Sequence, residues 1–217
     1  FDNVFLIEAS RGCSHGCRFC AAGYLYRPPR TNPLPALLDL VRQGADHTSK
    51  IGLVGTAISD LPDLTAVCAA ARQRDLQLGF SSLRADALNA DLVGALKDGR
   101  VKTATIAPET GSERMRQVIN KGLDEQDILK ATEALVSGGI PNLKLYFMVG
   151  LPTETGEDIK AIIALVKKIK HHFLRASKPK GRMGEITVSL SCFIPKPFTP
   201  FQWSAIAEVK GLKHKIT

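Results

Sequence analysis

The sequence has no run of apolar residues close to the ~20 that a bilayer-spanning helix needs. Its longest aliphatic stretch near the C-terminus, AIIALV, is followed at once by Lys167 and Lys168. It also lacks a secretory signal, an internal repeat and a low-complexity linker. These absences argue against a membrane, secreted or repeat protein. We therefore expect a cytoplasmic protein with no membrane partner.

The length and composition are those of a globular domain. A chain of 217 residues buries roughly 70% of its extended surface, which is enough for a substantial core. Hydrophobic residues make up 44% and charged residues 23%, both ordinary values for such a domain. Residue 1 is a phenylalanine, and a strand-like segment begins within three residues. We expect residues 1–217 to be a single core domain excised from a longer protein.

The net charge of +8 leaves two interpretations open. Basic proteins attract anions, including nucleic acid. Much of the excess, however, lies in Lys167–Arg182 and in Lys210–Lys215. We interpret the first run as a helix end that continues into a solvated loop, where cations suit the negative end of the helix dipole. A nucleic-acid surface and an ordinary solvated face both fit this pattern.

Cysteine is scarce, and three of the five cysteines stand close together. Cys13, Cys17 and Cys20 form a C-x3-C-x2-C run, whereas Cys68 and Cys192 lie far away in apolar stretches. An iron–sulfur cluster with four irons usually takes four cysteines. Three thiolates would leave one iron open to a substrate or cofactor, which converts an electron-transfer site into a reaction site.

The three cysteines also admit uses other than an open-iron cluster. A disulfide would leave one cysteine over in a chain without a secretory signal. A structural zinc site wants a fourth Cys or His, and only His15 lies between the first two cysteines. Zinc and a structural or electron-transfer cluster therefore remain as alternatives to an open-iron cluster.

Strand-length apolar runs alternate with helix-length amphipathic segments, which predicts an α/β protein with parallel strands. The predicted strands are Val4–Ala9, Lys50–Val54, Gln77–Ser81, Thr103–Ala107, Leu143–Val149 and Glu185–Phe193. The predicted helices are Pro35–Gln43, Leu61–Arg74, Asn89–Lys97, Ser112–Asn120, Glu125–Ser137 and Thr155–Lys170. Asp60 is placed to cap the second helix, with Pro62 in its first turn, and Cys68 falls on that helix's core face.

Polar and glycine-rich residues follow the strands at their C-terminal ends, where barrel active sites lie. Inside the sixth predicted strand, period-two alternation places two sets of residues on opposite faces. Thr187, Ser189 and Ser191 would face the interior, as would Lys144 and Tyr146 of the fifth strand. These interior residues either approach a substrate or simply pack. Cys192 would pack against helices.

The motif RGCSHGCRFC, with Phe19 before the third cysteine, resembles the cluster loop of the radical S-adenosylmethionine (radical SAM) enzymes. With CRFCAAGYLYRPPR, SSLRAD, APETGSER, INKG, KLYFMVGLPTE and PKPFTPFQW, the chain resembles the branch that carries an N-terminal cobalamin-binding domain. The resemblance implies a partial (β/α)6 TIM-like barrel. It also implies a 4Fe-4S cluster on Cys13, Cys17 and Cys20, which would be the catalytic and metal-binding residues.

The same resemblance implies a set of residues that contact S-adenosylmethionine at the strand ends. Backbone groups of the GTA turn would meet its methionine moiety, an acidic side chain after the fourth strand would help to hold it, and backbone groups after the fifth strand would approach its adenine. The implied residues are Phe19, Gly55, Thr56, Ser81, Arg84, Glu109, Val149 and Gly150.

Three of these assignments have plain structural alternatives. Gly55 suits an ordinary turn, because glycine is common there. Glu109 could complement a helix N-terminus. Arg84 could pair with Asp86 on the surface instead of with the cofactor's carboxylate. Downstream, the aromatic residues Phe198, Phe201 and Trp203 offer an apolar surface that could close the open side of the barrel.

The function implied by the resemblance is reductive cleavage of S-adenosylmethionine, which starts radical chemistry on an unidentified substrate. An electron donor such as flavodoxin or ferredoxin would be the partner, and a small-molecule substrate is favoured over RNA. Cobalamin-dependent methylation is a further reading, with cobalamin bound by a domain absent from this sequence. The alternatives are an RNA-modifying, methylthiotransferase-like enzyme, suggested by the basic charge, and a non-catalytic metal-cluster scaffold.

Overall fold

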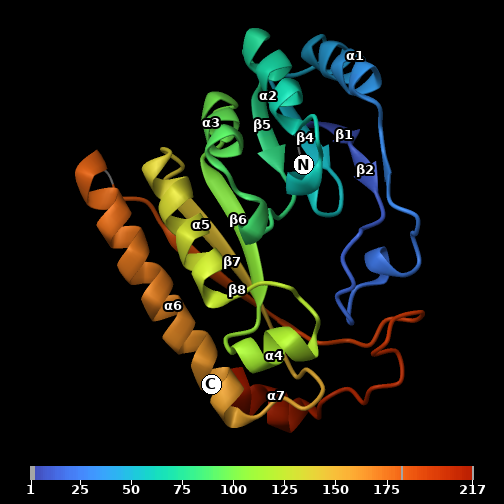
Figure 1. Ribbon diagram of the computed structural model, residues 1–217, viewed down its shortest axis with the longest axis vertical. Helices are drawn as coiled ribbons and strands as arrows, with labels where there is room; N and C mark the ends of the chain where they lie inside the picture. The colour runs from blue at the N-terminus through green and yellow to red at the C-terminus, as the bar shows by residue number, and fades with distance from the viewer. Residues whose placement is uncertain (1–2, 182, 217) are drawn as a thin grey trace.

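The computed structural model describes residues 3–181 and 183–216 and contains two parallel three-stranded sheets (Figure 1). The first has the order β1 (Phe5–Glu8), β4 (Lys50–Val54) and β5 (Gln77–Phe80). The second has the order β6 (Thr103–Glu109), β7 (Asn142–Val149) and β8 (Ile186–Cys192). A parallel bridge between Leu83 and Ile106 joins the two sheets. The predicted α/β architecture with six parallel strands is confirmed.

Helices line the outside of these strands (Figure 1). The α-helices of the described residues are α1 (Leu34–Ala45), α2 (Leu64–Gln73), α3 (Ala90–Asp98), α4 (Glu113–Val118), α5 (Glu125–Ser137), α6 (Gly156–Ser177) and α7 (Val209–Ile216). Short 3-10 turns lie at Ala21–Gly23, Ile58–Asp60, Ala85–Ala87 and Lys178–Lys180. A small antiparallel pair, β2 (Ser10–Arg11) with β3 (Arg30–Thr31), brackets the cysteine loop.

Local sequence explains where several helices begin. The Asn89 side chain accepts a hydrogen bond from the Leu92 N–H and so caps α3. Reciprocal capping boxes start α5, through Asp124 and Asp127, and α6, through Thr155 and Asp158. Each such cap contributes about 1 kcal/mol by satisfying backbone donors that have no partner within the helix.

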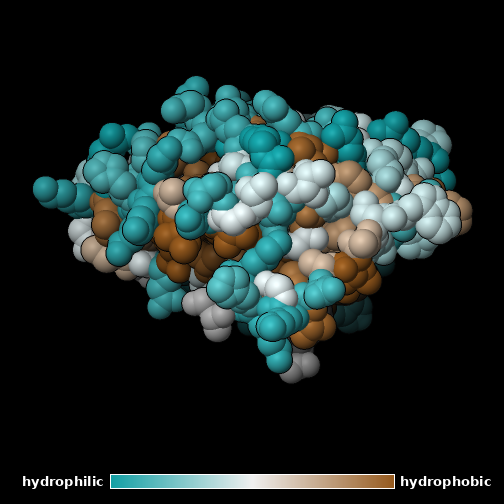
Figure 2. Space-filling view, turned by 90° about the horizontal axis from the view of Figure 1, so that it is seen from below, coloured by the Kyte–Doolittle hydropathy of each residue, from teal (hydrophilic) through white to brown (hydrophobic). Residues whose placement is uncertain are grey.

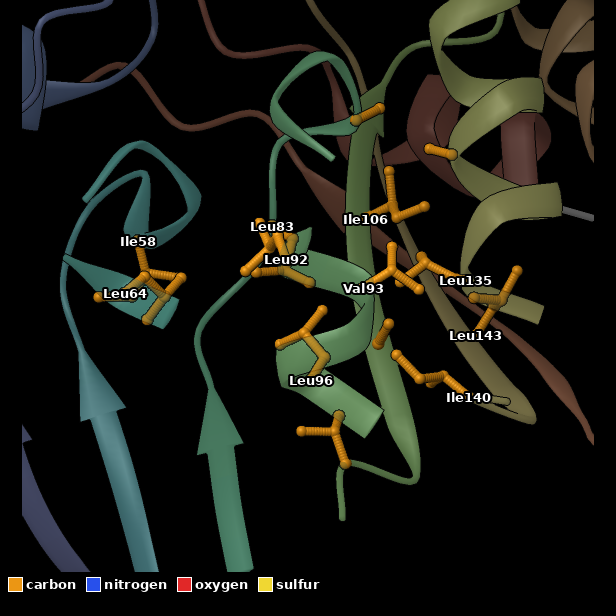
Figure 3. Packing of buried hydrophobic residues seen from close by; sticks show 14 of the residues in the cluster. Ile58, Leu64, Leu83, Leu92, Val93, Leu96, Ile106, Leu135, Ile140 and Leu143 are labelled. Atoms are coloured by element: carbon orange, nitrogen blue, oxygen red, sulfur yellow. The ribbon is translucent and has the colours of Figure 1, made fainter. Parts of the chain in front are cut away.

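The core lies between the outer faces of the strands and the helices. Leu143 and Ile106 from β7 and β6 meet Leu135 and Val93 from α5 and α3 (Figure 3). Full burial of each such side chain contributes roughly 1.5–3 kcal/mol. Cys68 belongs to this core, with no exposed surface, as predicted. The strands thus use their outer face to pack against helices, and the inner face of the sheets does not take part in this core.

Strand register sets which side chains share the inner face. Thr105, Lys144 and Thr187 are register partners across β6, β7 and β8. Paired residues of parallel strands point to the same side of a sheet, and their sequence neighbours point to the other. Leu143 and Leu145 are buried against the helices, so this row faces inward. The predicted alternation of inner and outer residues is confirmed.

Two predicted helices differ from the observed ones. Helix α2 begins at Leu64, not Leu61, and the Asp60 side chain does not cap it, because its carboxylate bonds to His15 instead. Helix α6 continues to Ser177, so most of the expected solvated loop is helical. Its amphipathic period persists through Ile169 and Phe173, which are buried, and this burial outweighs the basic character of the segment. Arg182 lies outside the described residues.

The prediction that Cys192 packs against helices is wrong. The side chains of Val188 and Leu190 on the same face of β8 are 40% and 46% exposed, and Cys192 is exposed too. Strand β8 ends the order of its sheet, beside β7. Its outer face therefore carries no helix among the described residues.

The aromatic segment after β8 has a divided role. Phe201 packs against a small cluster that includes Phe193, whereas Phe198 and Trp203 are 67% and 89% exposed. The molecule seen from below shows hydrophobic patches set among hydrophilic residues (Figure 2). Of the three aromatic residues expected to close the barrel, Phe201 packs against this cluster, whereas Phe198 and Trp203 extend into solvent. Over the described part of the chain, no helix is both long and apolar enough to span a membrane.

Candidate functional site

The cysteine loop is held in a compact turn by its own hydrogen bonds. The Cys13 N–H donates to the Ala22 carbonyl at 3.1 Å, and the Cys20 N–H donates to the Cys17 carbonyl at 3.0 Å. The Tyr24 hydroxyl donates to the Gly16 carbonyl at 2.8 Å. The loop follows β1 and thus starts from the C-terminal end of the first sheet.

The end of α4 holds the same loop from the other side. The Arg18 N–H donates to the Ile119 carbonyl at 2.9 Å, and its guanidinium donates to the Val118 carbonyl at 2.6 Å. The Asn120 amide donates to the Gly16 carbonyl at 2.8 Å. In Figure 1 the blue loop, α4 and the red C-terminal segment gather at the lower right of the molecule. The site is therefore assembled from both sheets.

Two glycines are required by close backbone contacts in this loop. A Cβ atom on Gly23 would lie 2.2 Å from the His15 carbonyl oxygen. Gly12 has a φ of +85°, and a Cβ there would lie 2.1 Å from the Tyr26 carbonyl oxygen. Only glycine permits both the left-handed backbone at Gly12 and these approaches. The path of the loop is thus encoded locally.

The donor set fits a cluster with three protein ligands. Within residues 3–181 and 183–216, no three His, Cys, Asp or Glu side chains are placed around a single metal ion. A four-iron cluster makes a different demand, because each thiolate binds its own iron. All three thiols belong to the same loop. Cys17 is buried, whereas Cys13 and Cys20 are half-buried.

The surroundings of Cys17 act on its thiol in opposite directions. Burial raises the pKa of the Cys17 thiol, and the positive charges of Lys121 and Arg84 offset this rise only in part. Iron binds the thiolate, so ligation displaces the proton that burial would otherwise retain. By contrast, burial without any such cation raises the pKa of Cys68 to about 12. Cys68 is an unreactive core residue.

Glu109 ends β6 beside this loop, but its carboxylate is already paired. Its Oε1 accepts a hydrogen bond from Lys121 Nζ at 2.9 Å, and both side chains are largely buried. Glu109 has a φ of +68° and lies just after a register shift in the pairing of β6 with β7. A non-glycine residue in this left-handed region is uncommon and points to a constrained position. The ion pair holds the carboxylate at the strand end.

Arg84 has the partner that the alternative interpretation offered. Its guanidinium makes a two-pronged contact with the Asp86 carboxylate, at 3.0 and 2.7 Å. It also donates to the carbonyls of Lys121 and Gly122. The Arg84 side chain is 8% exposed and the Asp86 side chain is 35% exposed, so a buried guanidinium pairs with a carboxylate at the surface. Arg84 thus anchors the segment that carries Lys121.

The turn after β4 approaches the cysteine loop. The Ser81 hydroxyl donates to the Gly55 carbonyl at 2.8 Å, and the Ser10 hydroxyl lies 3.5 Å from the Thr56 carbonyl. A small cavity of about 110 Å³ has both Cys13 and Thr56 in its wall. The structure therefore brings the GTA turn and the first cysteine together, as the resemblance implies for a shared cofactor.

The end of β7 forms another part of the same region. Phe19 packs against a small apolar cluster whose buried members include Met148 and Leu151, next to Val149 and Gly150. The Gly150 N–H donates to Glu154 Oε1 at 2.8 Å. Gly150 has a φ of +82°, which favours glycine. The third cysteine's neighbour and the predicted adenine-binding strand end are thus adjacent.

Sequence reasoning missed several residues that hold the site. Asn120 and Lys121 lie in the INKG segment, whose positive-φ residues Asn120 and Gly122 mark the end of α4. Glu154 binds the Gly150 N–H and also Lys215 Nζ of α7, at 2.5 Å, a helix that was not predicted. The helix-stop pattern of INKG is a signal for the turn. The partners across the fold carry no local signal.

Comparisons with known proteins agree with this geometry. The family model described as "Radical SAM superfamily" matches residues 7–166. An uncharacterized protein of Methanocaldococcus jannaschii is 40% identical over 93% of this chain and 43% of its own length. A tRNA-2-methylthio-N(6)-dimethylallyladenosine synthase of Chloroherpeton thalassium is 23% identical over 75% of this chain and 39% of its own. The chain thus spans less than half the length of these curated relatives.

A solved structure shares the fold. The radical S-adenosylmethionine methyltransferase TsrM of Kitasatospora setae, determined with cobalamin and a 4Fe-4S cluster, superposes with a TM-score of 0.71. The identity is 14%, and the match covers 92% of this chain and 38% of that one. At this identity the likeness concerns the fold alone.

Proposed function

Because the chain belongs to the radical SAM superfamily, we propose that it binds a 4Fe-4S cluster through Cys13, Cys17 and Cys20 and cleaves S-adenosylmethionine reductively. The observation that carries this proposal is the three-cysteine loop fixed between β1 and the end of α4, with no fourth cysteine near it in the sequence. When bound, the cluster supplies the electron that splits the sulfonium into methionine and a deoxyadenosyl radical.

The residues of this chain have distinct tasks in the proposal. The three cysteines hold the cluster, and Phe19 with its apolar neighbours excludes water from one side of it. The turn at Gly55 and Thr56 offers backbone groups beside Cys13. Val149 and Gly150 offer backbone groups at the end of β7, where a Cβ atom on Gly150 would lie 2.8 Å from Leu212 Cδ2, so the glycine makes room for α7.

Glu109 requires a revised role in this scheme. Its carboxylate is paired with Lys121, so a cofactor contact would be made by the ion pair as a unit. The carboxylate has further lone pairs for a ribose hydroxyl or the amino group. Arg84, bonded to Asp86 and to two carbonyls, positions Lys121 and leaves no free edge for the cofactor's carboxylate.

The test is electron paramagnetic resonance of the anaerobically reconstituted, dithionite-reduced chain, with and without S-adenosylmethionine. A cluster signal that changes on addition of the cofactor, together with formation of 5′-deoxyadenosine, supports the proposal. A cluster signal that ignores the cofactor, or zinc in place of iron, contradicts it. In that case the non-catalytic scaffold would be the better interpretation.

We also propose that residues 1–217 are the core domain of a longer enzyme, since the relatives extend well beyond the matched segment. Cobalamin-dependent methylation is the finer reaction favoured by the likeness to the TsrM fold. Transfer of a labelled methyl group from S-adenosylmethionine to added cobalamin by the full-length protein is the measurement. Formation of deoxyadenosine without any cobalamin methylation would favour hydrogen abstraction alone.

Methylthiolation of RNA is a second candidate, favoured by the relative that is named as a tRNA-modifying synthase and by the net charge of +8. Binding through phosphate contacts releases counterions, so the affinity for tRNA must fall steeply as salt rises. Affinity that is indifferent to salt would remove the electrostatic reason for this candidate. A small-molecule substrate remains the favoured one.

A further inference from the structure

The inner face of the second sheet carries a lysine flanked by two hydroxyl groups. Lys144 of β7 lies in register with Thr105 of β6 and Thr187 of β8. Adjacent strands are roughly 4.8 Å apart, so the three side chains stand side by side. In the next row, Tyr146 is the partner of Ser189. The cation is therefore set in a frame of hydroxyl groups contributed by all three strands.

Lys144 has no carboxylate partner within residues 3–181 and 183–216. Its ammonium group lies 5.0 Å from the centroid of the Tyr146 ring, two residues nearer the end of the strand. The inward-facing Glu8 and the strand-end Glu109 are already paired, with Arg11 and Lys121. Both acidic groups that the strands direct toward this side are thus engaged elsewhere.

The row is accessible and is not packed as a core. Lys144 is half-buried, Thr187 is exposed, and the Tyr146 side chain is 38% exposed. A partly desolvated cation without a counterion is costly, and an incoming anion offsets that cost. Hydroxyl groups on either side add hydrogen bonds to the anion's remaining lone pairs.

We propose that this row, Thr105–Lys144–Thr187, binds an anionic group, carboxylate or phosphate, of the enzyme's substrate. The inference rests on the proposed function, because it places the substrate on the inner face below the cysteine loop. Lys144 precedes the end of β7 by five residues, about 16 Å at 3.3 Å per residue. The anion is therefore anchored deep on the sheet, and the reacting carbon of an elongated substrate points toward the strand ends.

Three small probes with a short alkyl chain test the charge requirement on the reconstituted chain: butyrate, neutral butyramide of the same size, and the larger butyl phosphate. Ligand-observed NMR titration measures their dissociation constants without reductant or S-adenosylmethionine. We expect at least one anion to bind roughly tenfold more tightly than butyramide, because charge-assisted hydrogen bonds exceed neutral ones. The tighter of the two anions identifies phosphate or carboxylate as the group. Equal binding of all three probes overturns the proposal.

Variants then assign the effect to Lys144. Lys144→Met weakens the preferred anion about tenfold or more, whereas Lys144→Arg retains its binding within about threefold. The control is Lys160→Met, whose lysine is exposed and pairs with Glu157 on α6. Anion binding by Lys144→Met at the wild-type level overturns the proposal.

Two further measurements keep the test decisive. If Lys144→Met fails to fold by circular dichroism, acetylation of Lys144 in the wild-type chain replaces it, read by peptide mass spectrometry. Protection of Lys144, but not Lys160, by the anion supports the site, and equal acetylation with and without it contradicts the site. Wild-type protein that binds the anion through Lys144 but forms no deoxyadenosine contradicts the proposed function only. Deoxyadenosine formation without anion binding contradicts only this inference.

Discussion

The middle rows of the two sheets differ on the inner face. In the row that pairs β1, β4 and β5, the inward residues are Leu6, Gly52 and Gly79, none with a polar side chain. The corresponding row of β6, β7 and β8 is Thr105, Lys144 and Thr187. Both sheets bury aliphatic residues against helices on the outside. The two sheets thus pack against helices on the outer face in the same way, and they differ on the inner face.

This contrast fits the two proposals made above. The first sheet has no polar side chain in its middle row, and the cysteines and the GTA turn lie in the loops at its end. The second sheet places hydrogen-bonding groups on the strands themselves. Loops can bend around a cofactor, whereas strand side chains are held rigidly at fixed spacing. Under these proposals the first sheet serves the cluster and the second serves the substrate.

The largest expected effect comes from breaking the cysteine loop alone. Cys17→Ala should abolish assembly of a complete four-iron cluster, since one iron loses its thiolate. Iron and sulfide analysis of anaerobically reconstituted protein measures this. Cys192→Ala, at an exposed position, is the matched control and should keep full iron content. Anion binding by the second sheet should survive Cys17→Ala, and its loss would contradict the division between the halves.

A second prediction concerns the buried Arg116 of α4, which lies in the part of the chain that carries the second sheet. Its guanidinium donates to the carbonyls of Thr110, Gly111 and Leu123, with 1% of its side chain exposed. Arg116→Ala leaves these carbonyls without partners and should lower the free energy of unfolding by roughly 3 kcal/mol. Urea denaturation measures the loss.

The matched control for Arg116 is an exposed arginine. Arg72 pairs with Asp98 at the surface with 64% of its side chain exposed, so Arg72→Ala should change stability by less than about 1 kcal/mol. Equal losses in the two variants would show that the buried guanidinium is not what holds α4 in place.

A third prediction is a pH dependence confined to the second half. Burial would raise the pKa of Asp158, but hydrogen bonds from Arg114, Ser112 and Thr155 outweigh it and hold that pKa well below its usual value. A depressed pKa adds stability above the unfolded value of about 3.9, and this stability is lost as pH falls further.

The measurement is the unfolding free energy of Asp158→Asn against wild type across pH. The variant should be less stable by roughly 1–3 kcal/mol at pH 7, and the difference should shrink as the pH falls below about 4. A difference that stays constant from pH 7 to pH 3 would show that the charge of Asp158 contributes little.

The smallest effect is expected at the contact between the cysteine loop and the end of α4. Asn120→Ala removes the hydrogen bond to the Gly16 carbonyl, worth about 1 kcal/mol. The loop should then lose iron to a chelator severalfold faster, while the fold persists. Gln117→Ala is the control, because only the backbone carbonyl of Gln117 contacts the loop, through Arg18. Identical rates of iron loss in both variants would remove Asn120 from the site.

Much of the fold follows from local patterns. The α5 boundaries at Glu125 and Ser137 match the prediction, because a capping box starts the helix and Gly138-Gly139 follows it. The inward and outward faces of β7 and β8 also follow from period-two alternation. The end of α6 did not follow, since the buried Phe173 continues a stripe that a run of basic residues obscures.

The cysteine spacing alone determined the kind of cofactor chemistry to expect, because ligands within one short loop need no distant partner. Only the tertiary structure decided how the other site residues are used. It paired Glu109 with Lys121, it directed the Arg84 guanidinium to the carbonyls of Lys121 and Gly122, and it joined Asn120 to a loop 104 residues away. The sequence sets the chemistry of each side chain, whereas the partner of that side chain depends on how the whole chain folds.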